Sequence, residues 1–257
     1  MPDANTQQSP PEHPRVTGPD GGPIYTETPQ EILNGQPYPG LIAEPWNTAT
    51  AFLFVVIVVV WLIRLGPRIL KHPFMAVTLP ILLAGGIGGT LYHGLRNWSG
   101  YFRLDVFPIY LLGLMLSIYF WIRLGPKIRY LVAMIAVLAL IQVFGFLQLP
   151  RVWAINVSYA MLALLILVPL AVVLVRTRCR YVGWVITALV AFGIAWFCRL
   201  ADNPPNPPLL PMGTHWLWHT FGAITTAALT EYVYRLEGVS LRQASTSPTS
   251  TTSPKSA

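Results

Sequence analysis

The sequence predicts an all-α membrane protein, a bundle of seven transmembrane helices with its N-terminus outside and its C-terminus in the cytoplasm. Of its 257 residues, 54% are hydrophobic and only 11% are charged, whereas a soluble domain has about 25% charged residues. The apolar residues gather into seven stretches, each near the roughly 20 residues that span a bilayer. The basic residues gather in alternate loops between these stretches, which is typical of a multi-pass membrane protein.

The seven predicted helices form one membrane domain over residues 42–236. They lie at roughly 44–65, 74–95, 104–122, 130–148, 152–175, 181–200 and 213–235. Residues 1–41 are rich in Pro, Gly, Gln and Thr, so we expect a flexible N-terminal arm that builds no core. Residues 237–257 are expected to form a disordered Ser/Thr-rich tail.

The basic residues predict the orientation of the bundle. The odd loops are richest in them: Arg64, Arg68 and Lys71 in the first, Arg123, Lys127 and Arg129 in the third, and Arg176, Arg178 and Arg180 in the fifth. Cytoplasmic loops carry the excess of Lys and Arg, so these loops are predicted to be cytoplasmic. The basic excess, a formal net charge of +7, is therefore explained by Lys and Arg in cytoplasmic loops, and no nucleic-acid partner is expected.

Four ionisable residues are predicted to meet near the extracytoplasmic face. His93 ends the second helix, Asp105 begins the third, and His215 and His219 begin the seventh. The end of an even helix and the start of an odd helix lie on the same side of the membrane. His215 and His219 are also four residues apart, which puts both imidazoles on one face of their helix.

Three histidines and one aspartate inside membrane spans favour a metal site, because ionisable groups there are costly and usually functional. Three imidazole ligands leave a fourth position open, which is the pattern of catalytic zinc. Zinc lowers the pKa of its bound water to about 7, and Asp105 is a candidate to take and return the proton. The expected substrate is a membrane lipid with a hydrolysable bond. The alternative is a structural polar cluster, in which His93 caps its helix or His215 is hydrogen-bonded to Asp105.

Glu44 lies on the same face, at the start of the first predicted helix. Together with the following Pro-Trp-Asn it offers oxygen ligands to a hard cation such as calcium, which binds six to eight oxygens. The other interpretation is that Glu44 caps its helix, since acidic residues are favourable in the first turn. Both interpretations stay open at this point.

Five motifs follow one another along the predicted membrane domain. They are Ala43-Glu-Pro-Trp-Asn47, the Gly-rich run into Tyr92-His93, Leu104-Asp105 with Pro108 and Tyr110, Arg199-Leu-Ala-Asp202, and Pro211-Met-Gly-Thr-His-Trp-Leu-Trp-His219. In this order, over about residues 40–236, they resemble the alkaline ceramidase family. This family belongs to the superfamily of seven-helix hydrolases that includes the progestin and adipoQ receptors.

The resemblance implies a zinc-dependent hydrolase that cleaves the amide of ceramide-like lipids to a sphingoid base and a fatty acid. It implies His93, His215 and His219 as the zinc ligands and Asp105 as the group that handles the proton of water. It also agrees with the orientation predicted from the loop charges.

Two positions depart from the family pattern. The family usually has a serine four residues before the second-helix histidine, where this chain has Gly89. In the family, this serine helps to stabilise the developing oxyanion, and Thr90 is the candidate to replace it here. Loss of one such donor typically costs about 10²–10³ in rate. The family's calcium site draws on an acidic stretch just upstream of the residue that matches Glu44, and this chain lacks it. Glu31, Asn34 and Glu44 are the remaining candidates for calcium.

Two other classes of function stand against the hydrolase. Glycine at position 89 favours a non-catalytic lipid receptor or sensor with a structural zinc. A transporter is disfavoured, because the predicted bundle offers no polar path to the cytoplasmic side and Glu231 alone does not make one.

Overall fold

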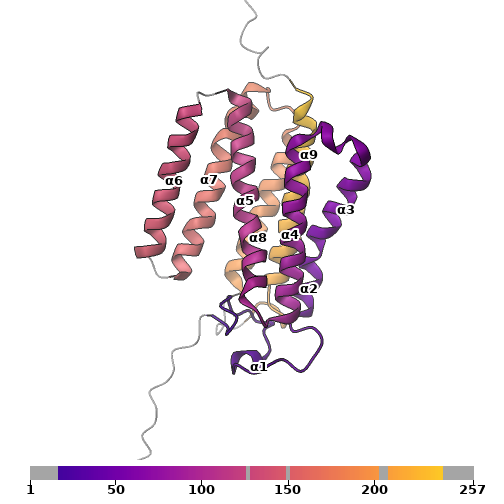
Figure 1. Ribbon diagram of the computed structural model, residues 1–257, viewed down its shortest axis with the longest axis vertical. Helices are drawn as coiled ribbons and strands as arrows, with labels where there is room; N and C mark the ends of the chain where they lie inside the picture. Colours follow the sequence, from indigo (N-terminus) through magenta and orange to yellow (C-terminus); the bar gives the residue numbers. More distant parts are fainter. Residues whose placement is uncertain (1–16, 126–127, 149–150, 203–207, 240–257) are drawn as a thin grey trace, which may run out of the picture.

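The computed structural model describes residues 17–125, 128–148, 151–202 and 208–239, and Figure 1 shows its long helices running roughly along one axis. The elements are α1 (Gln30–Leu33), α2 (Pro45–Ala51), α3 (Leu53–Leu65), the 3₁₀ helix η1 (Gly66–Lys71), α4 (Pro73–Leu95), α5 (Ser99–Leu124), α6 (Ile128–Gln148), α7 (Arg151–Arg176), α8 (Val182–Ala201) and α9 (His215–Glu237). The predicted all-α fold is confirmed for the described part of the chain.

Four helical segments are long and apolar enough to cross a membrane. They are Pro45–Lys71, Pro73–Leu95, Ser99–Leu124 and Val182–Ala201. Large apolar side chains on these segments face outward, among them Ile63 and Phe197, which are 78% and 62% exposed. Such outward apolar surface suits lipid contact, so the chain is a membrane-embedded helical protein. The seven spans and the orientation stay predictions.

The long helices begin and end within a few residues of their predicted bounds, with two differences. The first predicted helix is divided at Phe52 into α2 and α3. The third begins at Ser99, directly after the extended residue Trp98, and not at residue 104. Asp105 therefore lies in the second turn of α5 and does not begin it.

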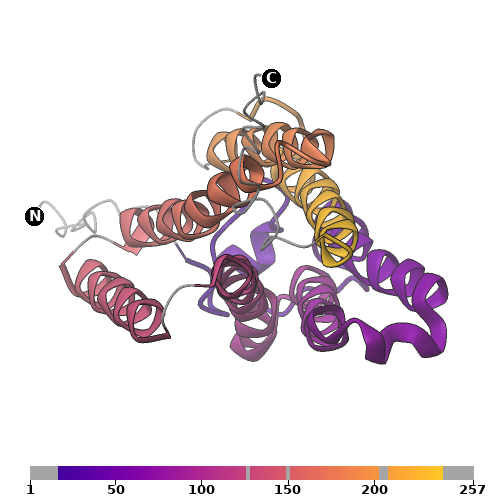
Figure 2. The ribbon, with the colours of Figure 1, turned by 90° about the horizontal axis from the view of Figure 1, so that it is seen from above.

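Apolar packing concentrates at the end of the bundle that holds the basic loops. One cluster joins α5, α7, α8 and α9 around Phe120, Val173 and Tyr232. A second joins α3 and α4 around Val58 and Met75. Figure 2 shows α6 outermost at one side, where it packs on α7. The opposite end of the bundle contains a polar core.

Residues 17–34, which we call the N-terminal strap, fold against this polar end and include α1 (Figure 1). Asp20, Tyr25, Thr28 and Ile32 of the strap are buried. The prediction of a flexible arm is thus wrong for residues 17–34. The physical reason is that the strap packs few apolar groups but supplies hydrogen-bond partners to buried polar groups of the bundle. Residues 1–16 of the predicted arm and 240–257 of the predicted tail lie outside the described residues.

Candidate metal centre

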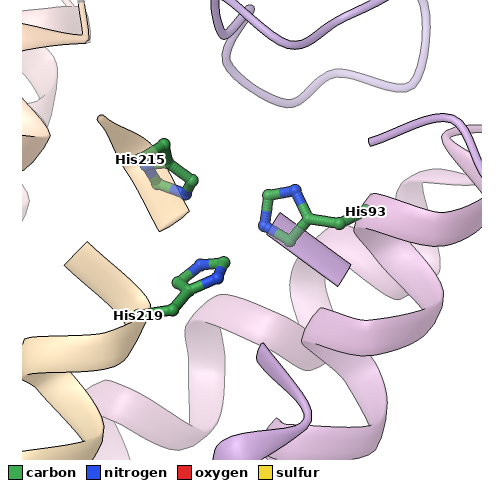
Figure 3. A group of neighbouring side chains, drawn as sticks. All are labelled: His93, His215 and His219. Carbon is green, nitrogen blue, oxygen red and sulfur yellow. The ribbon is translucent and has the colours of Figure 1, made fainter. Parts of the chain in front are cut away.

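Three imidazoles converge at the polar end of the bundle (Figure 3). His93 comes from the last turn of α4, and His215 and His219 come from the first two turns of α9. All three are buried, and their ligand nitrogens lie within 4.8 Å of one another. Three nitrogens on one tetrahedral ion, at about 2.0–2.1 Å from it, lie about 3.3–3.4 Å apart. A small inward movement of the rings therefore lets this group hold a metal ion.

A carboxylate determines which nitrogen of His93 is available. Nδ1 of His93 lies 2.5 Å from Oε2 of Glu44. An ionised carboxylate only accepts hydrogen bonds, so Nδ1 carries the proton and Nε2 keeps its lone pair. Nε2 is buried and has no hydrogen-bond partner among the described residues. Such an imidazole, with one nitrogen donating to a carboxylate and the other unpaired, is typical of a metal ligand.

His219 is oriented in the same manner, by a backbone carbonyl. Its Nδ1 lies 3.1 Å from the carbonyl oxygen of Asn47 in α2. The carbonyl can only accept, so Nδ1 donates and Nε2 is left for a ligand. His215 is held through its backbone, since its N–H donates to Oδ2 of Asp202 at 2.8 Å. Its ring stacks on Tyr25 of the strap with centroids 3.8 Å apart, and its Nδ1 is buried without a partner among the described residues.

Glycine is required where the chain enters α9. Gly213 has a φ of +74°, and a Cβ there would lie 2.5 Å from Oδ2 of Asp202. The same oxygen accepts from the backbone N–H groups of Thr214 and His215. Asp202 thus caps α9 from the end of α8. Glycine is needed at residue 213 because the Asp202 carboxylate lies so close to its backbone. A side chain there would push the carboxylate away from the N-terminus of α9.

Glu44 is fully buried, and each of its oxygens has two partners. Oε1 accepts from the Thr28 hydroxyl at 2.6 Å and lies 3.1 Å from Nη1 of Arg96. Oε2 accepts from His93 and from the amide of Asn47. Burial alone raises the pKa of Glu44, but the His93 hydrogen bond and the charge of Arg96 outweigh it and place the pKa below its usual value. Glu44 therefore serves His93 as an ionised acceptor.

Neither earlier interpretation of Glu44 describes what the carboxylate does. As the N-cap residue of α2 it makes no capping hydrogen bond with its side chain; Glu27 of the strap accepts from the free N–H groups of that helix instead. For the calcium interpretation, none of the described contacts links Glu44 to Glu31 or Asn34. Asn34 is exposed and accepts a hydrogen bond from Gln30. The described contacts therefore give no support for a calcium site made by Glu44, Glu31 and Asn34.

Three consecutive strap residues reach the groups that orient the three histidines. Thr26 donates to Oδ1 of Asp202 from both its N–H, at 2.9 Å, and its hydroxyl, at 2.7 Å. Glu27 accepts from the N–H of Asn47 at 2.9 Å, and Thr28 donates to Glu44. Through these partners the strap is connected to His215, His219 and His93 in turn. Residues 26–28 are therefore an integral part of the centre.

Asp105 lies beside the centre and is not one of the grouped ligands. Its carboxylate rests over Gly89 of α4, where a Cβ would lie 2.6 Å from Oδ1. Gly89 precedes His93 by one helical turn, so the carboxylate is on the face of α4 that carries His93. A Cβ on Gly88 would lie 2.6 Å from the backbone of Leu104. The glycines thus let α5 approach α4 closely enough to place Asp105 on the face of α4 that carries His93.

Thr90 does not offer a hydrogen bond to the centre. Its hydroxyl donates to the carbonyl of Gly86 in its own helix at 2.7 Å. The donor that was expected to replace the family serine is therefore used within α4. The space of a side chain at position 89 is taken by Asp105.

The three histidines that the sequence predicted to meet are grouped in the structure, whereas the roles of the residues that orient them were not predicted. Asn47 acts through its backbone carbonyl, which no residue type reveals. The roles of Asp202, Thr26 and Thr28 depend on contacts between distant segments. The available signal was the presence of acids, Asp20 and Glu27 among them, in a Pro- and Gly-rich segment beside an apolar domain.

Comparison with known proteins adds no family assignment: no protein-family model matches the chain, and no curated protein matches it. The fold and the site define a helical, membrane-embedded protein in which three buried histidines can hold a metal ion.

Proposed function

We propose that this protein is a zinc-dependent intramembrane hydrolase that cleaves the amide bond of ceramide-like N-acylated lipids. The products are a sphingoid base, or another amine, and a fatty acid. One observation carries the proposal: three buried imidazoles, two with their Nδ1 atoms fixed by acceptors, face one another beside a carboxylate that is not a ligand. That is the donor set of a catalytic zinc site with an open position.

The chain's own residues suit hydrolysis of an amide. When bound, zinc supplies a Lewis acid and lowers the pKa of water. Asp105 takes a proton from the attacking water at a carboxylate oxygen and returns it to the amide nitrogen as the C–N bond breaks. Glu44 and the carbonyl of Asn47 keep the imidazoles in their orientation throughout.

The choice of a lipid amide rests on the membrane-length helices and on the resemblance to the alkaline ceramidase family. We extend the proposal to seven spans, with the metal centre near the extracytoplasmic face. The basic residues at the opposite end of the bundle, among them Arg68, Lys71 and Arg178, support this orientation.

A lipid receptor or sensor with a structural zinc is the second candidate. One observation favours it: the Thr90 hydroxyl bonds within its own helix and position 89 has no side chain. An amide hydrolase that lacks an oxyanion donor at positions 89 and 90 would turn over about 10²–10³ more slowly than one that has it. A receptor needs no such donor.

Two measurements on purified protein test the hydrolase: zinc content, and release of fatty acid from a panel of ceramides and other N-acylated lipids. We expect one zinc per chain and release of fatty acid. His219→Ala lowers the zinc content, whereas Asp105→Asn keeps zinc and loses release by about 10²–10⁴-fold. The matched control is His72→Ala, because His72 pairs with Glu237 at the other end of the bundle.

Zinc absent from the wild type, or unaffected by His219→Ala, contradicts the metal centre. Zinc with lipid binding but no release supports the receptor. Release that persists in Asp105→Asn contradicts the role of that carboxylate.

A further inference from the structure

A buried arginine sits between the strap and the metal centre. Arg96 is 3% exposed, and it follows α4 in the left-handed backbone region with a φ of 48°. Glycine or asparagine is usual at such a helix end. An arginine there accepts backbone strain, which suggests that its side chain is needed at this place.

The guanidinium of Arg96 joins two buried carboxylates that come from different segments. Nε lies 2.8 Å from Oδ2 of Asp20 in the strap, and Nη1 lies 3.1 Å from Oε1 of Glu44. Nη1 also donates to the hydroxyl of Tyr92, at 2.7 Å, and both Nη1 and Nη2 donate to the carbonyl of Pro23, at 3.0 Å. Two carboxylates, a carbonyl and a hydroxyl thus surround one positive charge.

Without that charge, the two buried carboxylates would keep hydrogen-bond donors but would lose their positive counter-charge. An uncompensated buried charge is strongly destabilising. A planar guanidinium suits the position, because its fork of donors reaches several acceptors at once, whereas a lysine ammonium acts as a point charge. A group of oxygen atoms such as the one around Arg96 can also bind calcium. Here the guanidinium occupies the position that a calcium ion would take.

We propose that Arg96 is an internal cation of this end of the molecule. It locks the strap through Asp20 and positions the His93 imidazole through Glu44, so the metal centre assembles without calcium. Arg96 is a positioning residue and touches no ligand nitrogen. The inference rests on the proposed metal centre but not on amide hydrolysis.

Cobalt(II) is the probe, because its visible spectrum reports the geometry of its ligands. Full-length wild type is compared with Arg96→Met, Arg96→Lys and Asp20→Asn. Arg103→Met is the matched control, since Arg103 is an exposed arginine in the first two turns of α5. Three quantities are measured: cobalt affinity, the visible spectrum, and cleavage by a Glu-specific protease after Glu27 and Glu31.

In Arg96→Met we expect cobalt affinity to fall by about 10–100-fold, as for other partners that orient metal ligands, with a changed spectrum and faster cleavage of the strap. Arg96→Lys partly restores the affinity. Asp20→Asn exposes the strap to the protease and lowers the cobalt affinity less than Arg96→Met does, because Glu44 keeps its arginine partner. Arg103→Met behaves as the wild type. Millimolar calcium leaves the wild-type cobalt affinity unchanged.

A folded Arg96→Met protein with wild-type affinity and spectrum overturns the proposal. If that variant does not fold, the other measurements decide: cobalt affinity of the wild type that rises with calcium, or wild-type cleavage in Asp20→Asn, overturns it. Lipid hydrolysis is read separately. A wild type that cleaves no amide while these cobalt results hold refutes the proposed hydrolase and leaves the role of Arg96 intact.

Discussion

At the scale of single residues, metal binding depends on where the proton of His93 lies. Glu44, kept ionised by Arg96 and His93, makes Nδ1 the donor and leaves Nε2 unprotonated. A neutral amide at position 44 can present either an oxygen or an NH₂ group to the ring, so it no longer selects the tautomer. The orientation of a metal ligand is thus controlled by a residue that does not touch the metal.

We therefore expect Glu44→Gln to lower zinc affinity by about 10–100-fold. The measurement is competition with a chromogenic chelator. Glu31→Gln is the control, because Glu31 lies half-buried in α1 and no described contact joins it to Glu44. Equal affinities for wild type and Glu44→Gln would show that the tautomer is selected by something else.

A second residue-scale prediction concerns Gly89 and Thr90. A Cβ at position 89 would lie 2.6 Å from Oδ1 of Asp105, so Gly89→Ala displaces the carboxylate. Displacement by about 1 Å can cost about 10²-fold in rate, while zinc content stays at the wild-type level. Thr90→Val removes a hydroxyl that bonds only within α4 and leaves turnover close to wild type. Fatty-acid release tests both variants, and a loss in Thr90→Val of about 10²–10³ would instead identify Thr90 as the oxyanion donor.

At the scale of elements, α9 is held in register by a carboxylate from another helix. Asp202 accepts from the N–H groups of Thr214 and His215 and from Thr26 of the strap. These bonds fix the height and rotation of the turn that carries His215. Apolar packing fixes the other end of α9, around Tyr232 and Val233.

Asp202→Ala should lower the free energy of unfolding by about 0.5–2 kcal/mol, as expected for loss of a helix cap. It should also lower zinc affinity, because His215 loses its backbone anchor. Thermal unfolding in detergent, followed by the change in Tm, measures the first effect. Thr226→Ala is the control in the same helix, since the Thr226 hydroxyl bonds only to Gly222. A Tm drop no larger than that of the control would contradict the capping role.

At the scale of the whole molecule, the sequence predicts the positions of the helices better than the contacts between their ends. Hydrophobic length locates the long helices, and alternation of sides brings His93 and His215 to one end without any structure. The strap was beyond this reasoning, because its contacts run from Thr26 and Thr28 to single atoms of distant residues and leave no periodic pattern. Arg96 was missed for a related reason: a lone arginine in a loop resembles an interfacial residue until its two carboxylates are known.

The two ends of the molecule differ in charge, and this difference predicts its orientation. Arg176, Arg178 and Arg180 flank Cys179, an exposed cysteine in the connection between α7 and α8. Because basic loops stay in the cytoplasm, a membrane-impermeant maleimide should label Cys179 only after cells are permeabilised. Leu41 is 88% exposed near the metal end, so Leu41→Cys in a Cys179→Ser background should be labelled in intact cells. The reverse pattern would place the metal centre at the cytoplasmic face, and its lipid substrate would then come from the inner leaflet.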